Sequence, residues 1–191
     1  CCCLVYSATL PRDSFDSGTS MSELSKNLGV FQNHALNSGP AVAGYSLRCI
    51  RFIINRIPSI LDQSSFPFGL LTWCLASGPK LTSRFVRLEI ASLVCNFTVC
   101  VAVSTRHQLL SHAKESCIFI LHSAFDKSED PFIRSVCVAT VAAILSQTSQ
   151  LFRDDASSVG SAAGKLAEST NLASQHLGLM LHDGIVAAGG Y

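Results

Sequence analysis

Charged side chains are scarce in this chain of 191 residues, and neither sign is in clear excess. Only 14% of the residues are Asp, Glu, Lys or Arg, against about 25% in an average soluble domain. The 14 Lys and Arg residues nearly balance the 13 Asp and Glu residues, so the net charge is +1. Without a basic surplus, binding to nucleic acid or to anionic lipid is not expected. The composition also excludes a disordered chain, because 48% of the residues are hydrophobic.

Motifs for metal binding, cofactor binding and catalysis are missing as well. The nine cysteines include no CxxC pair and the six histidines include no HExxH arrangement. The stretch GSAAGKL, residues 160–166, has three residues between its glycines and a leucine after the lysine. A phosphate-binding loop needs four residues there, and then Ser or Thr. Because no cysteine has a base placed beside it either, we expect no catalytic residue, no metal and no cofactor.

Hairpin turns are lacking, which favours helices over strands. No Asn-Gly or Asp-Gly pair joins alternating apolar runs, and the apolar runs are too long for typical strands. The pattern predicts helices near 41–61, 66–77, 84–103, 105–125, 131–152 and 158–182. Residues 1–30 are interpreted as an apolar start followed by a linker rich in Ser, Asp and Gly. Within this linker, residues 20–29 can form a short helix with Ser20 as its N-cap.

No targeting signal is visible, and the chain begins with Cys1 rather than Met, which we interpret as an excerpt of a longer chain. From Cys49 onward, each cysteine lies within or beside an apolar run, where a thiol behaves as a small buried hydrophobe. We therefore expect reduced thiols in an intracellular protein, cytoplasmic or nuclear; a disulfide framework or a redox sensor is the alternative. The glycosylation sequon Asn96-Phe97-Thr98 falls in an apolar helix and is expected to be unused.

Long apolar runs without charge are also absent. The run 88–103 has 16 residues and contains one acid, whereas a bilayer span takes about 20 apolar residues. Arginines flank this run, and such flanks fit a buried core helix as well as a membrane helix. We do not expect membrane embedding. The alternative is a multi-pass or membrane-associated helical protein, with its helices at 66–103 and 115–152.

An internal repeat organises the apolar helices. The trio Phe-Val-Arg that ends at Arg87 corresponds to Phe-Ile-Arg ending at Arg134, 47 residues later. A weaker copy places Ser-Leu-Arg, ending at Arg48, at the opening of an apolar helix 39 residues before Arg87. In the best copy, Asp130 suits the N-cap because its carboxylate can accept hydrogen bonds from the first turn. Pro131 suits the first helical position because it has no amide proton to leave unpaired.

At these residues the chain resembles the HEAT and armadillo family of helical repeats. The resemblance covers roughly residues 31–152. It is carried by Asp130-Pro131, then a β-branched residue and Arg134, then a helix that mixes small and large apolar residues. It implies an all-α fold of stacked antiparallel helix pairs, an α-solenoid. In that family the arginine opens the second helix and packs against an acidic or backbone acceptor. That role is implied here for Arg134, Arg87 and Arg48.

The repeat divides residues 31–191 into units of about 31–61, 66–103 and 105–152, with a partial unit at 158–191. The copies depart from the family pattern, since Lys80 and Ser83 stand where the best unit has acids. The first copy has no acidic turn at all.

Stacked repeats present extended surfaces, so we expect a non-catalytic scaffold or adaptor segment that binds other proteins. A regulatory helical region of a larger enzyme is a further alternative. Terminal repeats need polar caps, yet the stretches CCCLVY and LMLHDGIVAAGGY at the two ends are apolar. We therefore expect the 191 residues, expressed alone, to self-associate.

Overall fold

The computed structural model describes residues 18–63, 66–103, 109–126, 128–147, 156–168 and 172–187. All regular elements within these ranges are helices, and no strand occurs in them, which confirms the all-α class. The chain divides into two compact units, residues 1–96 and 97–191, and each is described by itself.

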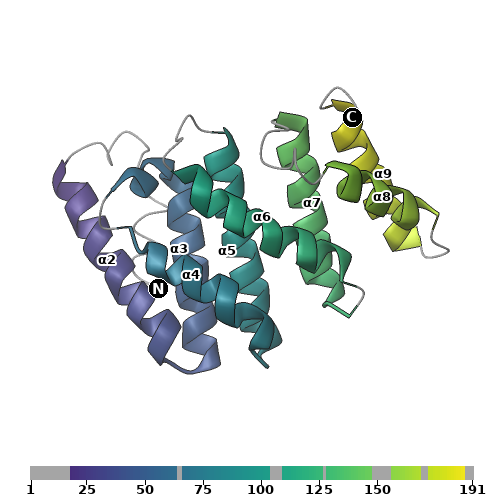
Figure 1. The fold of residues 1–191 in the computed structure, drawn as a ribbon. Helices are drawn as coiled ribbons and strands as arrows, with labels where there is room; N and C mark the ends of the chain where they lie inside the picture. The colour runs from purple at the N-terminus through teal and green to yellow at the C-terminus, as the bar shows by residue number, and fades with distance from the viewer. Residues whose placement is uncertain are drawn as a thin grey trace. The chain divides into compact units, whose positions relative to one another are not determined.

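The first unit builds its core around two long helices that pack side by side, α2 and α3 (Figure 1). Its elements are α2 (Gly18–Asn37), α3 (Pro40–Arg56), the 3-10 helix η2 (Pro58–Asp62), α4 (Phe68–Ser77), the 3-10 helix η3 (Gly78–Lys80) and the first part of α5 (Arg84–Val103). Helix α2 buries Leu24, Leu28 and Ala35, whose spacing of four and seven residues places them on one face. Helix α3 buries a longer apolar stripe, made of Ala43, Leu47, Cys49, Ile50, Ile53 and Ile54.

Prolines set both ends of α3. Pro40 occupies the first helical position, and the carbonyl of Gly39 accepts the first helical hydrogen bond from the Ala43 amide at 2.9 Å. The helix ends at Arg56 because Ile57 precedes Pro58, whose ring disfavours helical backbone in the preceding residue. The single helix predicted for 41–61 is therefore wrong beyond residue 56, where a 3-10 turn takes over.

The predicted linker is wrong for residues 18–30, which form the first part of α2, whereas the short helix predicted for residues 20–29 is confirmed as part of α2. Ser20 is the third residue of this helix rather than its N-cap. Ser, Asn and Gly are weak helix formers, but Leu24 and Leu28 are buried in the first unit. Burial of these two leucines outweighs the weak helix propensity of their neighbours. The composition of the segment could not indicate this burial. Residues 1–17 lie outside the described part of the chain.

The second unit contains the end of α5 followed by α6 (Leu110–Phe125), α7 (Pro131–Gln147), α8 (Ala156–Ala167) and α9 (Leu172–Ala187). Helix α6 packs against α7, and α9 packs against both α7 and α8. Small and medium side chains fill this core, among them Ala113, Cys117, Ile120, Cys137, Val138 and Val141.

Helices α8 and α9 replace the single helix predicted for 158–182. Helix α8 ends at Ala167, and α9 begins at Leu172. The two helices approach so closely at Gly178 that a Cβ there would collide with the backbone of Ala167 and lie 2.8 Å from the Ala163 carbonyl oxygen. One continuous helix could not make this contact, and periodicity alone gives no sign of it.

Helix α5 begins at Arg84 and ends at Val103, as predicted. In the described part of the chain, it is the one helix long and apolar enough to cross a membrane, over Arg84–Ala102. Just over half of that stretch is buried, and the core helix of a soluble protein meets the same criterion. The sequon lies on this helix, where Thr98 is fully buried and the Asn96 side-chain oxygen is shielded from solvent.

Candidate functional site

Helix α3 carries exposed aromatic and apolar side chains on the side opposite its buried stripe. Val42, Tyr45 and Phe52 are exposed large hydrophobics, and Arg48 lies between them. Their spacing of three, three and four residues keeps all four on one side of a helix with 3.6 residues per turn. An exposed Tyr and Arg among apolar neighbours is a combination enriched at protein interfaces.

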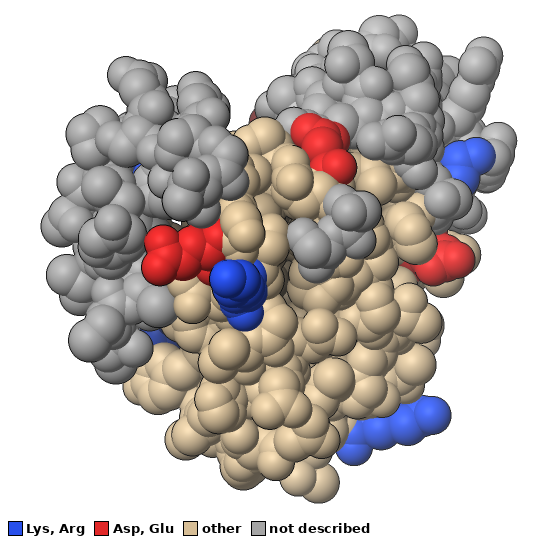
Figure 2. All heavy atoms as spheres, turned by 90° about the vertical axis from the view of Figure 1, so that its left-hand side faces the viewer, with Lys and Arg blue, Asp and Glu red and all other residues tan. Residues whose placement is uncertain are grey.

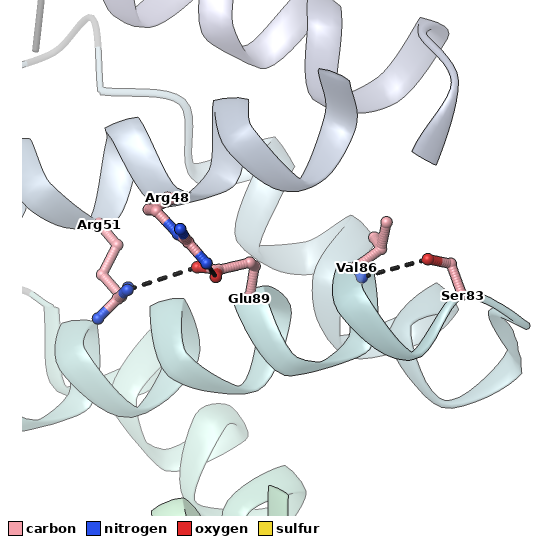
Figure 3. A network of polar contacts seen from close by, with 5 residues as sticks. All are labelled: Arg48, Arg51, Ser83, Val86 and Glu89. Carbon is pink, nitrogen blue, oxygen red and sulfur yellow. Dashed lines mark hydrogen bonds and ion pairs between the residues drawn. The ribbon is translucent and has the colours of Figure 1, made fainter. Parts of the chain in front are cut away.

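Behind this face, a buried carboxylate joins α3 to α5. Glu89 of α5 is only 2% exposed, and its Oε1 accepts hydrogen bonds from Arg48 Nε at 2.8 Å and Nη2 at 2.5 Å. Its Oε2 lies 3.4 Å from Nη2 of Arg51, one turn further along α3 (Figure 3). A buried carboxylate needs such partners because desolvation penalises its charged form.

Aromatic rings hold the Arg48 guanidinium on its other sides. Its central carbon lies 5.5 Å from the ring centroid of Tyr45 and 5.3 Å from that of Phe85, within the range of cation–π attraction. The two rings also pack edge to face, with centroids 5.3 Å apart. Gly44 makes this possible, since a Cβ at position 44 would collide with the Phe85 ring. The guanidinium is therefore fixed in one orientation at the surface of the first unit.

Charge at this site is not balanced. Two guanidinium groups face one carboxylate, so the three side chains together carry +1. The hydrogen bonds that Arg48 donates to Glu89 raise the pKa of Arg48, against an opposing effect of desolvation, so the guanidinium stays charged. Both arginines also reach solvent, because the side chain of Arg48 is 44% exposed and that of Arg51 is 36% exposed.

Two of the three copies of the repeat, those at Arg87 and Arg134, form equivalent helix starts. Asp130 caps α7 as predicted: its Oδ1 accepts a hydrogen bond from the Phe132 amide at 2.9 Å, and Pro131 opens the helix. Ser83 takes the same place before α5, where its Oγ lies 3.4 Å from the Val86 amide (Figure 3). Serine thus substitutes for the acid that the second copy lacks.

The pattern of buried positions in α5 repeats in α7 with the same offset of 47 residues. Val86 of α5 and Ile133 of α7 are both buried in the first turn of their helices. Further along, four positions of α5 and their counterparts in α7 are buried in each helix: Ile90, Ala91, Val94 and Phe97, then Cys137, Val138, Val141 and Ile144.

The three arginines of the repeat have different surroundings. Arg87 and Arg134 are each the fourth residue of their helix, and both are half-buried. The Nε of Arg134 is buried and has no hydrogen-bond partner among the described residues. Arg48 is the ninth residue of α3, because that helix begins at Pro40. The prediction that Arg48 opens its helix is therefore wrong, although the residue does pair with an acid.

An acidic residue also lies at the turn before α7. Hydrogen bonds from the Ser128 hydroxyl and amide lower the pKa of Asp126, and the positive charges of His122 and Arg134 act in the same direction. Asp126 directly follows α6 and Arg134 belongs to α7, so a weak, solvent-screened attraction acts between these two helices.

Groups capable of chemistry are dispersed in the described ranges. Cys49, Cys74, Cys95, Cys117 and Cys137 are buried thiols, as expected for core cysteines. Burial raises the pKa of the Cys74 thiol to about 12, which leaves it protonated and unreactive at neutral pH. Residues 160–166 lie inside α8 rather than in a loop. No group of three or more His, Cys, Asp or Glu residues in the described ranges is placed to hold a metal ion.

Glu89 is a residue of this site that the sequence did not single out. A signal was present, since Glu89 is the one acid in a largely apolar helix. A lone acid in such a run is rarely buried unless it is paired. The pattern could not identify its partner, because Arg48 is 41 residues away in sequence.

Comparison of this chain with protein-family models, with curated proteins and with solved structures finds no match.

Proposed function

We propose that this protein is a non-catalytic scaffold or adaptor built from stacked antiparallel helix pairs, as in the HEAT and armadillo proteins. The equivalent caps at Ser83 and Asp130 support this proposal, as does burial that repeats after 47 residues. Each unit of such a stack buries the apolar face of its neighbour, which explains helices that are apolar around most of their circumference.

The observation that carries the proposed function is a surface of large exposed side chains on a segment without charged residues. Residues 27–47 contain no Asp, Glu, Lys or Arg. Within the same segment, Val30 and Leu36 of α2 and Val42 and Tyr45 of α3 are exposed. Figure 2 views the molecule from the side of α2, and charged side chains are few over the described part of that face. Depletion of charge around exposed aromatic and aliphatic residues is typical of the centre of a protein interface.

Arg48 gives this surface an anchor for a partner. Arginine and tyrosine are the residues that most often dominate binding energy, provided that they are held in place beforehand. Here Glu89 and Phe85 hold the guanidinium, and about half of the Arg48 side chain remains accessible. We therefore propose the exposed side of α3, from Val42 to Phe52, as the binding face for other proteins.

The thiols support an intracellular location for this activity. Five buried cysteines on different helices remain reduced in the folded chain, which suits the cytoplasm or nucleus.

Site-specific photocrosslinking in cells tests the binding face. A photoreactive amino acid replaces Tyr45 in one variant and Phe52 in another, and Lys114, exposed on α6, carries it in the control. We expect the two α3 variants to give the same discrete adducts and the control to lack them. Adding Arg48→Ala should weaken these adducts. Identical products from all three positions, or none from α3, would contradict the proposal.

A further inference from the structure

Helix α9 leaves one side uncovered, and this side has the pattern of a helix-pairing seam. Leu172, Leu179 and Val186 are 80%, 56% and 61% exposed and follow one another at intervals of seven residues. His176, His182 and Asp183 are exposed as well, and Gln175 is partly exposed. With 3.6 residues per turn, all seven lie within about 60° of Leu179 around the helix. Gly178, by contrast, packs against α8.

We propose that this face of α9 pairs with the same face of a second copy of the chain, with the two helices antiparallel and Leu179 on the two-fold axis. Intervals of seven residues are those at which paired helices keep one seam in contact. In this register Leu179 meets Leu179 of the second copy, and Leu172 meets Val186. A two-fold interface uses one patch twice, so a single helix face is sufficient.

The polar residues beside the seam complement themselves in this register. His176 and Asp183 lie on the same flank, respectively three residues before and four residues after Leu179. Antiparallel pairing therefore brings His176 of each copy against Asp183 of the other, so two imidazole–carboxylate contacts form. On the opposite flank, Gln175 of each copy meets His182 of the other. Antiparallel pairing also opposes the two helix dipoles, which a parallel pair would align.

The size of the face limits the area that the contact can bury. Helix α9 has 16 residues and is about 24 Å long at 1.5 Å per residue. One helix pair of this length buries less than the roughly 1,600 Å² of a standard interface. We therefore expect a reversible dimer with a dissociation constant on the order of 1–100 μM. This inference does not depend on the binding face proposed for α3.

Sedimentation equilibrium of the 191-residue chain over a concentration series tests the pairing. Wild-type protein should show a monomer–dimer equilibrium, and Leu179→Lys and Leu179→Glu should each weaken dimerisation at least about tenfold, because like charges meet on the axis. An equimolar mixture of the two variants should recover dimers. The matched control is Ile118→Lys, which charges an apolar residue on α6 that is exposed at least as much as Leu179 and should leave the equilibrium unchanged. Circular dichroism verifies that each variant is folded.

A charge exchange tests the antiparallel register. Asp183→Lys should weaken the dimer by replacing the carboxylate opposite His176 with a cation that cannot accept a hydrogen bond, and adding His176→Glu should restore it. A parallel pair would set residue 183 against His182 and residue 176 against Gln175, so the double variant would not recover. A monomer at all concentrations would overturn the proposal. So would an Ile118→Lys effect equal to that at Leu179, a Leu179→Lys/Leu179→Glu mixture that stays monomeric, or a charge exchange without recovery.

Discussion

Separating Arg48 from Glu89 should destabilise the first unit, and by different amounts depending on which partner is removed. Arg48→Met keeps much of the apolar stem but leaves Glu89, 2% exposed, with a single contact of 3.4 Å to Arg51. An under-paired buried carboxylate costs about 3–5 kcal/mol when it is fully enclosed. Arg51 retains part of the attraction, so we expect a loss of about 2–3 kcal/mol in the free energy of unfolding.

Removing Glu89 should lower the free energy of unfolding by less, because water can hydrogen-bond to the arginines in place of the carboxylate. Glu89→Met leaves two guanidinium groups without their carboxylate partner, but their side chains are 44% and 36% exposed and can be hydrated. We expect a loss of about 1–2 kcal/mol. The double variant replaces an ion pair by apolar side chains, an exchange that is often close to neutral. Its loss should therefore be smaller than the sum of the single losses by about 1–2 kcal/mol.

Urea unfolding followed by Trp73 fluorescence measures this cycle. Trp73 is the single tryptophan of the chain and lies on α4, in the same unit as the ion pair. With a urea dependence of about 1–3 kcal/mol per molar, a loss of about 2 kcal/mol moves the midpoint by roughly 1 M. Additive losses within about 0.5 kcal/mol would refute the coupling. A larger effect for Glu89→Met than for Arg48→Met would refute the argument from exposure.

Three further changes test other parts of the structure. Gly178→Ala should lower the free energy of unfolding by about 1–3 kcal/mol, because the added Cβ meets the α8 backbone. Gly164 has open space around it, so Gly164→Ala should raise the free energy of unfolding by about 0.4–1 kcal/mol. Equal shifts of the two variants in thermal unfolding would contradict this reasoning. Asp130→Ala should cost about 0.5–2 kcal/mol through loss of the α7 cap, and Asp130→Ser should recover most of it. Burial raises the pKa of Cys74 from 9.0 to about 12, so the folded state retains a proton that the unfolded chain releases. Stability should therefore fall between pH 9 and 12 more steeply in wild type than in Cys74→Ala, and parallel pH profiles would disprove it.

Local signals in the sequence predicted the elements whose boundaries depend on local chemistry. Helix α5 begins and ends where expected, and α7 begins at Pro131 behind the cap of Asp130. Caps, prolines and turns act within a few residues, so a single sequence contains what is needed to find them.

Errors arose where distant segments decide the structure. Residues 18–30 look like a linker by composition, yet Leu24 and Leu28 are buried and hold them in a helix. The division between α8 and α9 accompanies a close contact of Gly178 with α8. The repeat pattern singled out Arg48, although Arg48 does not open its helix as the arginines of the other two copies do. Its partner Glu89 was not identified, because the two residues are 41 positions apart in the sequence.

The buried sequon on α5 would matter if the chain entered the secretory pathway. Oligosaccharide is added to Asn-X-Thr and is bulky and hydrophilic, so it is tolerated only at the surface of a folded protein. Here Thr98 is fully buried, and the Asn96 side-chain oxygen is shielded from solvent. A glycan attached to Asn96 before folding would keep α5 from entering the core, and that molecule could not mature. Expression by secretion should therefore yield glycosylated, misfolded chains, whereas Asn96→Gln would remove the acceptor.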